Sequence, residues 1–293
     1  MMRGSPLRPI GRSKGVHAVR SGAAGFTIVE VLIVLSVTGA MFISAFTLIN
    51  GKQDVASFNQ SIRNVQTELQ QVVTEVGSGH YPNNGTFKCD KDGPGGGTDI
   101  TAGTTAQGAN LHCLFLGRAI QFAVGTTVPE VYNVYTVVGL RGSAASPSTN
   151  LATAKARLLA RSASAADAAI PDNAYDTKRL LYGLAVSQPY LTANPGTSYA
   201  SFAITSKLGV IGASDASQQI DIVPIANSIL HDTKAAGVSK INAALPTATP
   251  NPAQGIDICF NSGSTNQSGK ITIGGSGRQG TINLKIYGTK DCV

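Results

Sequence analysis

Gly25-Phe26-Thr27-Ile28-Val29-Glu30 opens an apolar run that continues to Ile49. From Phe26 to Ile49 the only charged side chain is that of Glu30. A helix over these roughly 24 residues would be about 36 Å long, which is enough to cross the hydrocarbon core of a bilayer. The stretch therefore predicts a membrane helix. Glu30 needs its own explanation, because a carboxylate in hydrocarbon costs about 2.5–3.5 kcal/mol even on insertion scales.

The segment before this helix is basic. It carries five of the chain's 23 Lys and Arg residues and no acid: Arg3, Arg8, Arg12, Lys14 and Arg20. Without it the chain has 18 basic and 16 acidic residues, so the net charge falls from +7 to +2. The basic character belongs to the leader and does not indicate a nucleic-acid-binding chain. The positive-inside rule predicts that residues 1–25 stay cytoplasmic and that the C-terminal domain crosses the membrane.

The basic leader, Gly25, Phe26-Thr27-Ile28-Val29-Glu30 and the apolar helix together resemble the class III signal of type IV prepilins and of type II secretion pseudopilins. The resemblance implies that a prepilin peptidase cleaves after Gly25 and methylates the new N-terminus, Phe26. It also implies that Glu30 pairs with the N-terminal amine of a neighbouring subunit during filament assembly. Residues 1–25 would then be a cleaved leader, and residues 26–50 the membrane-spanning and filament-core segment.

Two simpler interpretations compete with this one. A secretory signal has an apolar core of about 7–15 residues and an Ala-x-Ala cleavage site, whereas this core is longer and contains an acid. An uncleaved single-span anchor fits the length equally well. Neither explains why the glycine, phenylalanine and glutamate stand where they do.

A second helical pattern follows the break in apolar sequence at Asn50-Gly51. Apolar residues recur three and four positions apart and form one seam: Val55, Phe58, Ile62, Val65, Leu69, Val72 and Val76. Residues 51–77 are therefore predicted to continue the membrane helix as an amphipathic helix that offers its seam to a folded domain. A short two-stranded coiled coil would show the same pattern.

Cysteine and aspartate residues supply the candidates for covalent and metal chemistry. Cys89, Cys113, Cys259 and Cys292 allow three disulfide pairings, and closeness in sequence favours Cys89 with Cys113 and Cys259 with Cys292. A zinc site is the rival, but the chain has no Cys-x-x-Cys pair. Residues 77–110 are expected to form a long loop. Its Asp90, Asp92 and Asp99 make a weak calcium site, or simply solvated loop residues.

Residues 78–293 are predicted to form an extracytoplasmic α+β domain whose antiparallel sheet packs on the second half of the helix. Strands are expected at 119–124, 131–140, 180–187 and 199–205, with a turn at 189–196 between the last two, and a C-terminal sheet is expected at 256–260, 270–273 and 282–286. An Ala-rich segment at 143–172 is interpreted as an insertion with room for a short helix. Residues 220–234 fit a helix after Pro224 or a strand.

The C-terminal sheet pattern with its final cysteine loosely resembles H-type minor pseudopilins and FimT-like minor pilins, some of which bind DNA through Gly-Arg-x-Arg. Here Gly277-Arg278-Gln279-Gly280 keeps only the first arginine. Arg278 is therefore a candidate DNA contact, with a solvated loop residue as the alternative.

Catalytic signatures are missing from the sequence: there is no His-Glu-x-x-His, no Gly-x-Ser-x-Gly and no Walker loop. We therefore expect a non-enzymatic, cofactor-free structural subunit, minor because of its size, of a type IV pilus or of a type II secretion or DNA-uptake pseudopilus. Its expected partners are the prepilin peptidase, other pilin or pseudopilin subunits, and membrane lipid before assembly. The alternative is a membrane-anchored or pilus-tip binding module, an adhesin or a DNA-binding minor pilin. The expected location is the inner membrane, then the filament at the cell surface.

Overall fold

A computed structural model gives the structure of the chain. The residues that it describes are 25–79, 87–93, 97–102, 113–122, 131–141, 148–159, 175–186, 190–191, 194–199, 201–206, 220–225, 234–248, 255–263, 265–274, 280–289 and 292. They fall into two compact units, Met1–Asn50 and Gly51–Val293. Residues 28–50 of the long helix α1 (Ile28–Ser78) make up most of the described part of the first unit, and residues 51–78 are the first element of the second.

The predicted course of α1 is confirmed. The helix continues through Asn50 and Gly51 and ends at Ser78, within two residues of the predicted end. Gly79 then adopts φ +65°, the left-handed conformation that glycine takes at helix ends, and its N–H donates to the carbonyl oxygen of Val76 at 3.1 Å.

In the described part of the second unit, the strands form two antiparallel six-stranded sheets and a separate hairpin of β1 (Phe87–Gly93) and β2 (Gly97–Ala102). The central sheet has the order β11-β10-β3-β4-β5, with β6 also pairing with β4. Its strands are β3 (Cys113–Phe122), β4 (Val131–Leu140), β5 (Arg157–Leu159), β6 (Tyr175–Arg179), β10 (Ser201–Ser206) and β11 (Ile220–Ile225).

The C-terminal sheet has the order β14-β13-β12-β8-β9, with β7 also pairing with β12. Its strands are β7 (Leu184–Val186), β8 (Tyr190–Leu191), β9 (Asn194–Ser198), β12 (Ile256–Ser262), β13 (Ser268–Ile273) and β14 (Ile282–Tyr287). The predicted run of three antiparallel strands at the C-terminus is confirmed, with Ile258 opposite Ile271 and Ile271 opposite Leu284.

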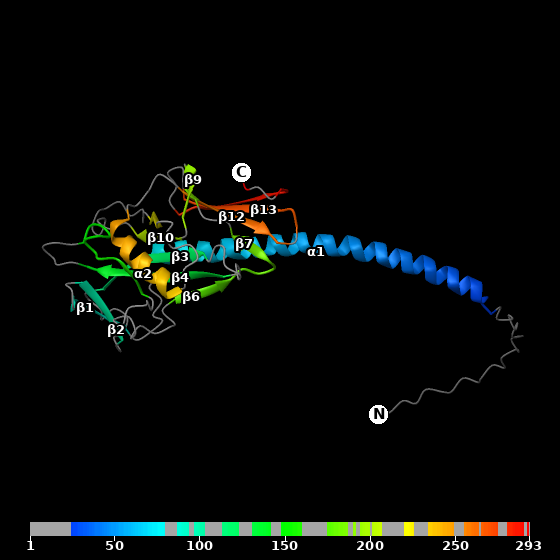
Figure 1. Cartoon of the computed structure of the whole chain (residues 1–293), viewed down its shortest axis with the longest axis horizontal. Helices are drawn as coiled ribbons and strands as arrows, with labels where there is room; N and C mark the ends of the chain where they lie inside the picture. The colour runs from blue at the N-terminus through cyan, green and yellow to red at the C-terminus, as the bar shows by residue number, and fades with distance from the viewer. Residues whose placement is uncertain are drawn as a thin grey trace, which may run out of the picture. The chain divides into compact units, whose positions relative to one another are not determined.

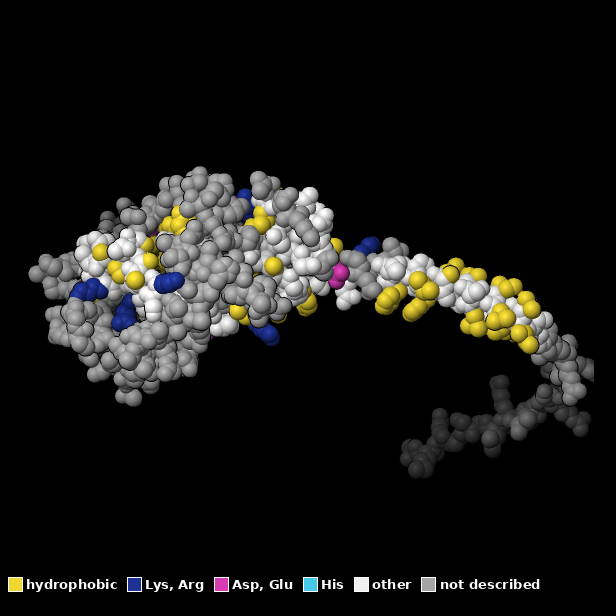
Figure 2. All heavy atoms as spheres, in the orientation of Figure 1, with side chains coloured by type: hydrophobic (Ala, Val, Ile, Leu, Met, Phe, Trp, Pro, Cys, Tyr) yellow, Lys and Arg dark blue, Asp and Glu magenta, His cyan; other side chains and the backbone are white. Residues whose placement is uncertain are grey.

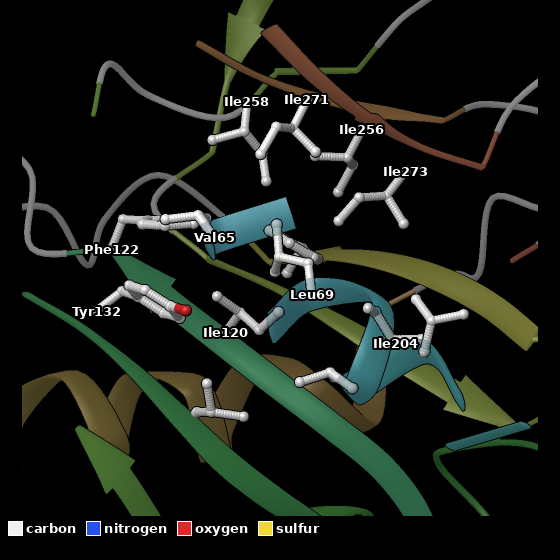
Figure 3. Close-up of a cluster of buried hydrophobic side chains, with 14 of the residues drawn as sticks. Val65, Leu69, Ile120, Phe122, Tyr132, Ile204, Ile256, Ile258, Ile271 and Ile273 are labelled. Carbon is white, nitrogen blue, oxygen red and sulfur yellow. The ribbon is translucent and has the colours of Figure 1, made fainter. Parts of the chain in front are cut away.

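The seam of α1 fills the space between the two sheets. Figure 3 shows Val65 and Leu69 between Ile256, Ile258, Ile271 and Ile273 of the C-terminal sheet and Ile120, Phe122, Tyr132 and Ile204 of the central sheet. Every predicted seam residue from Phe58 to Val76 is buried, and Val55 is partly buried. Each fully buried Val, Leu, Ile or Phe contributes about 1.5–3 kcal/mol, so burial of the seam makes a large contribution to the unit's stability.

Polar contacts fix how α1 sits on the central sheet. The buried Arg118 guanidinium forms an ion pair with Glu75 at 3.0 Å and donates to Thr136 Oγ1 at 3.0 Å. The hydroxyl of Tyr132 donates to Glu68 Oε2. Burial raises the pKa of Tyr132, and the bond to Glu68 raises it further, so the hydroxyl remains a donor. Glu68 and Glu75 of α1 are therefore partly covered.

A second core lies on the opposite face of the central sheet. There α2 (Lys234–Ala244) and the 3₁₀ helix Leu245–Thr247 bury Val238, Ile241 and Leu245 against Tyr135 and Val223. Figure 1 shows α2 beside β3, β4 and β10. The side-chain amide oxygen of Asn242 accepts a hydrogen bond from Leu158 N at 2.6 Å and ties α2 to β5.

Three predictions about this unit need correction, and one open alternative is decided. Residues 77–110 are not one long loop, because β1 and β2 form a hairpin within them. The segment 143–172 is more than an insertion: Leu151 and Leu158 are buried, and residues 157–159 form β5 rather than a helix. Of the two alternatives left open at residues 220–234, the strand is confirmed for residues 220–225, and the helix that follows begins only at Lys234. The turn expected at 189–196 contains β8 and the start of β9.

Gly269 of β13 faces α1 so closely that a Cβ built on it would lie 2.1 Å from Ile62 Cδ1, and Ile62 is fully buried. We predict that Gly269→Ala lowers the free energy of unfolding by about 1–3 kcal/mol, because the helix or the sheet must shift. Thermal unfolding of the full chain in detergent measures the effect. Gly288→Ala is the control, since a Cβ there meets nothing within 4 Å. Equal melting temperatures for the two variants would contradict the close packing.

Candidate functional site

The N-terminal end of α1 presents the residues that the sequence motif singled out. Gly25, Phe26 and Thr27 precede the first helical residue, Ile28, and the Phe26 side chain is 83% exposed. Glu30 lies in the first turn of the helix, where the partial positive charge of the backbone N–H groups favours a carboxylate.

Thr27 and Glu30 cap this helix by reciprocal hydrogen bonds. Thr27 Oγ1 accepts from Glu30 N at 3.3 Å, while Glu30 Oε2 accepts from Thr27 N and from Thr27 Oγ1, both at 3.1 Å. This is the capping box, whose sequence signature Thr-x-x-Glu can be read directly at 27–30, although the predictions above did not use it. The cap gives Glu30 a local role that needs no partner chain.

The carboxylate keeps capacity for a further contact. Both hydrogen bonds use Oε2, and within the described residues Oε1 accepts none. An ionised carboxylate can hold several donors, and an ammonium or guanidinium group forms the strongest such bonds. The site is therefore suited to binding a cation while the cap stays in place.

Behind Glu30, the first half of α1 is an uncovered apolar surface, and Figure 2 shows its hydrophobic side chains. The large apolar residues that stand exposed here are Phe26, Ile28, Val29, Val31, Leu32, Ile33, Val34, Leu35, Val37, Met41, Phe42, Ile43, Phe46 and Ile49. Of the helices in the described part of the chain, only α1 is long and apolar enough to cross a membrane. A contiguous apolar surface of this size indicates a membrane or protein contact.

The hydroxyl groups in this half are satisfied inside the helix. Ser36 Oγ donates to the carbonyl oxygen of Ile33 at 2.8 Å, Thr38 Oγ1 to that of Val34 at 2.7 Å, and Ser44 Oγ to that of Ala40 at 2.6 Å. In hydrocarbon a polar group must find its partner within the protein. Glu30 is therefore the one group between Phe26 and Ile49 whose charge remains to be balanced.

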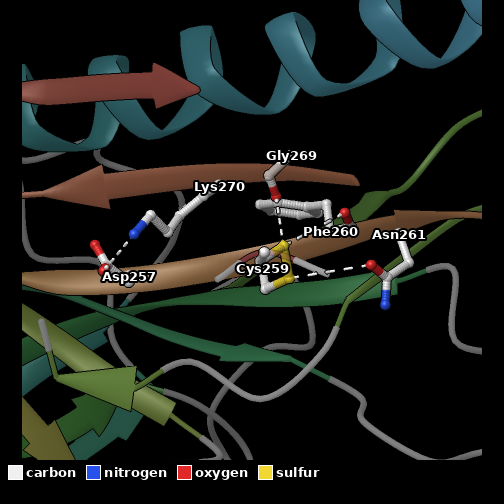
Figure 4. Close-up of a disulfide and its surroundings, with 7 residues drawn as sticks. Asp257, Cys259, Phe260, Asn261, Gly269 and Lys270 are labelled. Atoms are coloured by element: carbon white, nitrogen blue, oxygen red, sulfur yellow. Dashed lines mark hydrogen bonds and ion pairs between the residues drawn. A yellow bond between two sulfur atoms is a disulfide. The ribbon is translucent and has the colours of Figure 1, made fainter. Parts of the chain in front are cut away.

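The cysteine prediction is confirmed for one pair. Cys259 of β12 and Cys292 form a disulfide with a Cα–Cα distance of 5.9 Å, and it closes a loop over the β12–β14 part of the C-terminal sheet (Figure 4). Beside it, Asp257 Oδ2 pairs with Lys270 Nζ at 3.3 Å, and Asp257 Oδ1 accepts from Thr272 Oγ1 at 2.6 Å. The side chains of Cys89 and Cys113 lie outside the described part of the chain.

The remaining candidates are not brought into a described site. The hairpin pairs Asp90 with Asp99 in register, with Asp92 on the same strand as Asp90, but the side chains of these three residues are not described. Among the residues that are described, no group of three or more His, Cys, Asp or Glu residues could hold a metal ion. Arg278 lies outside the described residues.

Comparison of the chain with protein-family models, with curated proteins and with solved structures finds no match. Any account of function therefore rests on the sequence motif and on the geometry of α1.

The Cys259–Cys292 bond yields a prediction about stability. By the chain-entropy relation, opening a loop of 33 residues lowers the free energy of unfolding by about 4 kcal/mol at most. Cys259→Ser/Cys292→Ser should therefore unfold at lower denaturant concentration than the parent chain. Adding reductant to this double variant measures any contribution from Cys89 and Cys113. A variant as stable as the oxidised parent would contradict the structural role of the bond.

Proposed function

We propose that this chain is a filament subunit of the type IV pilin and pseudopilin class, inserted in the membrane through α1 and then assembled through the same helix. The observation that carries the proposal is Glu30, the sole charged side chain between Phe26 and Ile49, in the exposed apolar half of α1, which begins three residues after Gly25. A carboxylate in that position has a use if a cation meets it when the apolar surfaces of neighbouring helices pack together.

In this proposal a prepilin peptidase cleaves between Gly25 and Phe26 and methylates Phe26. The new amine would pair with Glu30 of an adjacent subunit, so that the cost of the buried charge is relieved only in the assembled filament. The amine would approach Glu30 while Thr27 still caps the helix, because the cap leaves Oε1 open. Assembly would thus join two pre-formed helices without refolding either one.

The architecture of α1 and of the second unit supports the proposal. One helix combines an exposed apolar half with a half that forms the core of an α+β domain. The Cys259–Cys292 bond agrees with a domain exposed to an oxidising compartment, because disulfides persist there. We propose a minor subunit with a structural role, located first in the inner membrane with its leader in the cytoplasm and then in a pilus or pseudopilus.

Glu30→Gln separates the role of Glu30 as a helix cap from its proposed role as the partner of an amine. Glutamine can still cap the helix by accepting from the Thr27 N–H, but it carries no charge. We predict normal cleavage after Gly25 and a loss of incorporation into sheared filaments of at least about tenfold, equivalent to about 1.4 kcal/mol. Immunoblots of the cell and filament fractions measure both.

Thr27→Ala is the matched control, because it removes the side-chain cap and keeps the carboxylate. It should incorporate better than Glu30→Gln. If Glu30→Gln assembles like the parent chain while Thr27→Ala fails, then Glu30 acts through the cap alone and the pairing account is wrong.

A further inference from the structure

A short turn between β6 and β7 exposes two large apolar side chains. Leu180 is buried and anchors the turn, whereas Leu181 is 45% and Tyr182 56% exposed. In the part of the second unit that the structure describes, these two are the only large hydrophobic residues in the exposed class. Because apolar side chains are normally buried when a domain folds, the exposure of Leu181 and Tyr182 calls for a separate explanation.

The turn is held in shape by three hydrogen bonds. The Leu181 carbonyl oxygen accepts from Ser61 Oγ of α1 at 2.8 Å and from Leu184 N at 3.2 Å, and the Gly183 carbonyl oxygen accepts from Gly263 N at 3.0 Å. Tyr182 has φ +57° and Gly183 φ +66°. The left-handed region disfavours any residue with a Cβ, so glycine would suit position 182 better than tyrosine. An exposed tyrosine in strained backbone is a feature typical of contact sites.

The turn lies at the end of the second unit where α1 enters. Phe58 is the first α1 residue that the unit buries, and Ser61, which holds the turn, follows three residues later. Figure 1 shows β7, which follows the turn, alongside α1. Phe58 itself comes only nine positions after Ile49, the last residue of the apolar run.

Basic residues precede the turn directly. Lys178 and Arg179 end β6, with Arg179 exposed and Lys178 partly so. The ion pairs among the described residues do not include either of them. The exposed Asp176 lies further from the turn on the same strand. Basic side chains next to a tyrosine and a leucine match the surface of an anionic bilayer, where aromatic rings lie at headgroup level and cations meet phosphates.

We propose that the Leu181–Tyr182 turn, together with Lys178 and Arg179, rests on anionic lipid headgroups while α1 is inserted in the membrane. The contact would hold the second unit against the bilayer before the subunit leaves it. This inference depends on membrane insertion of α1, which is part of the proposed function, but it does not depend on filament assembly.

The chain contains no tryptophan, so Tyr182→Trp places a single fluorescent reporter in the turn. The full chain is reconstituted into vesicles of phosphatidylcholine and phosphatidylglycerol, with bromine near the headgroups of the lipids in one set. We expect tryptophan emission at shorter wavelength than in detergent, and quenching by the brominated lipid. Quenching should fall in pure phosphatidylcholine and at high salt.

Two controls make the result specific. Ser78→Trp places the reporter at the exposed far end of α1 and should show no lipid quenching. In the Tyr182→Trp background, Lys178→Gln/Arg179→Gln should reduce quenching, whereas Arg141→Gln/Lys155→Gln removes two exposed basic residues elsewhere and should not.

Flotation of the vesicles distinguishes membrane insertion of α1, which belongs to the proposed function, from the lipid contact of the turn. If the Tyr182→Trp protein floats while its tryptophan stays unquenched, the lipid contact is overturned and membrane insertion is left intact. Protein that does not float overturns both. A blue shift that follows the protein-to-lipid ratio and ignores lipid charge shows that a second copy of the chain covers the turn, which also overturns the inference.

Discussion

The burial of one face of α1 between two sheets is the contact on which the second unit depends. The central sheet and the C-terminal sheet meet through Val65, Leu69 and their seam neighbours, so neither sheet completes its core without the helix. Arg118 and Tyr132 add polar contacts to Glu75 and Glu68 that fix the rotation of the helix. Because such cores are close-packed, sliding or rotating α1 would cost many contacts at once.

The same helix leaves a large apolar surface exposed. The apolar face of its second half is buried in the core of the second unit, but the described residues leave the apolar surface between Phe26 and Ile49 uncovered. Exposure of that apolar surface to water is unfavourable. A bilayer, or the corresponding helices of other subunits, would cover it. Glu30 tolerates either setting only if its charge is balanced. A filament in which each amine meets a carboxylate would provide that balance.

The sequence predicted the parts of the structure in which one face of an element is buried. The apolar residues three and four positions apart in α1, and the alternation at Ile256, Ile258 and Phe260, therefore predicted the helix and the strand correctly. It missed α2, whose apolar face consists of little more than Val238 and Ile241, and the β1–β2 hairpin, whose Gly and Asp residues favour turns. At the site, the prepilin-like motif singled out Glu30 as a charge in an apolar helix, whereas the capping bond with Thr27 follows from a different signal, the Thr-x-x-Glu spacing at 27–30. The exposed turn at Leu181 and Tyr182 has no sequence signal, since its strain and its hold on Ser61 arise from tertiary structure.

The mass of the N-terminal peptide, measured on protein isolated from the cells that make it, tests the central claim most directly. A chain that begins at Phe26 with a methylated amine is the predicted result, because both the cut after Gly25 and the modification follow from the class III signal. An intact leader, or a cut at any other bond, would contradict the account: without an amine at Phe26, Glu30 has only its helix cap.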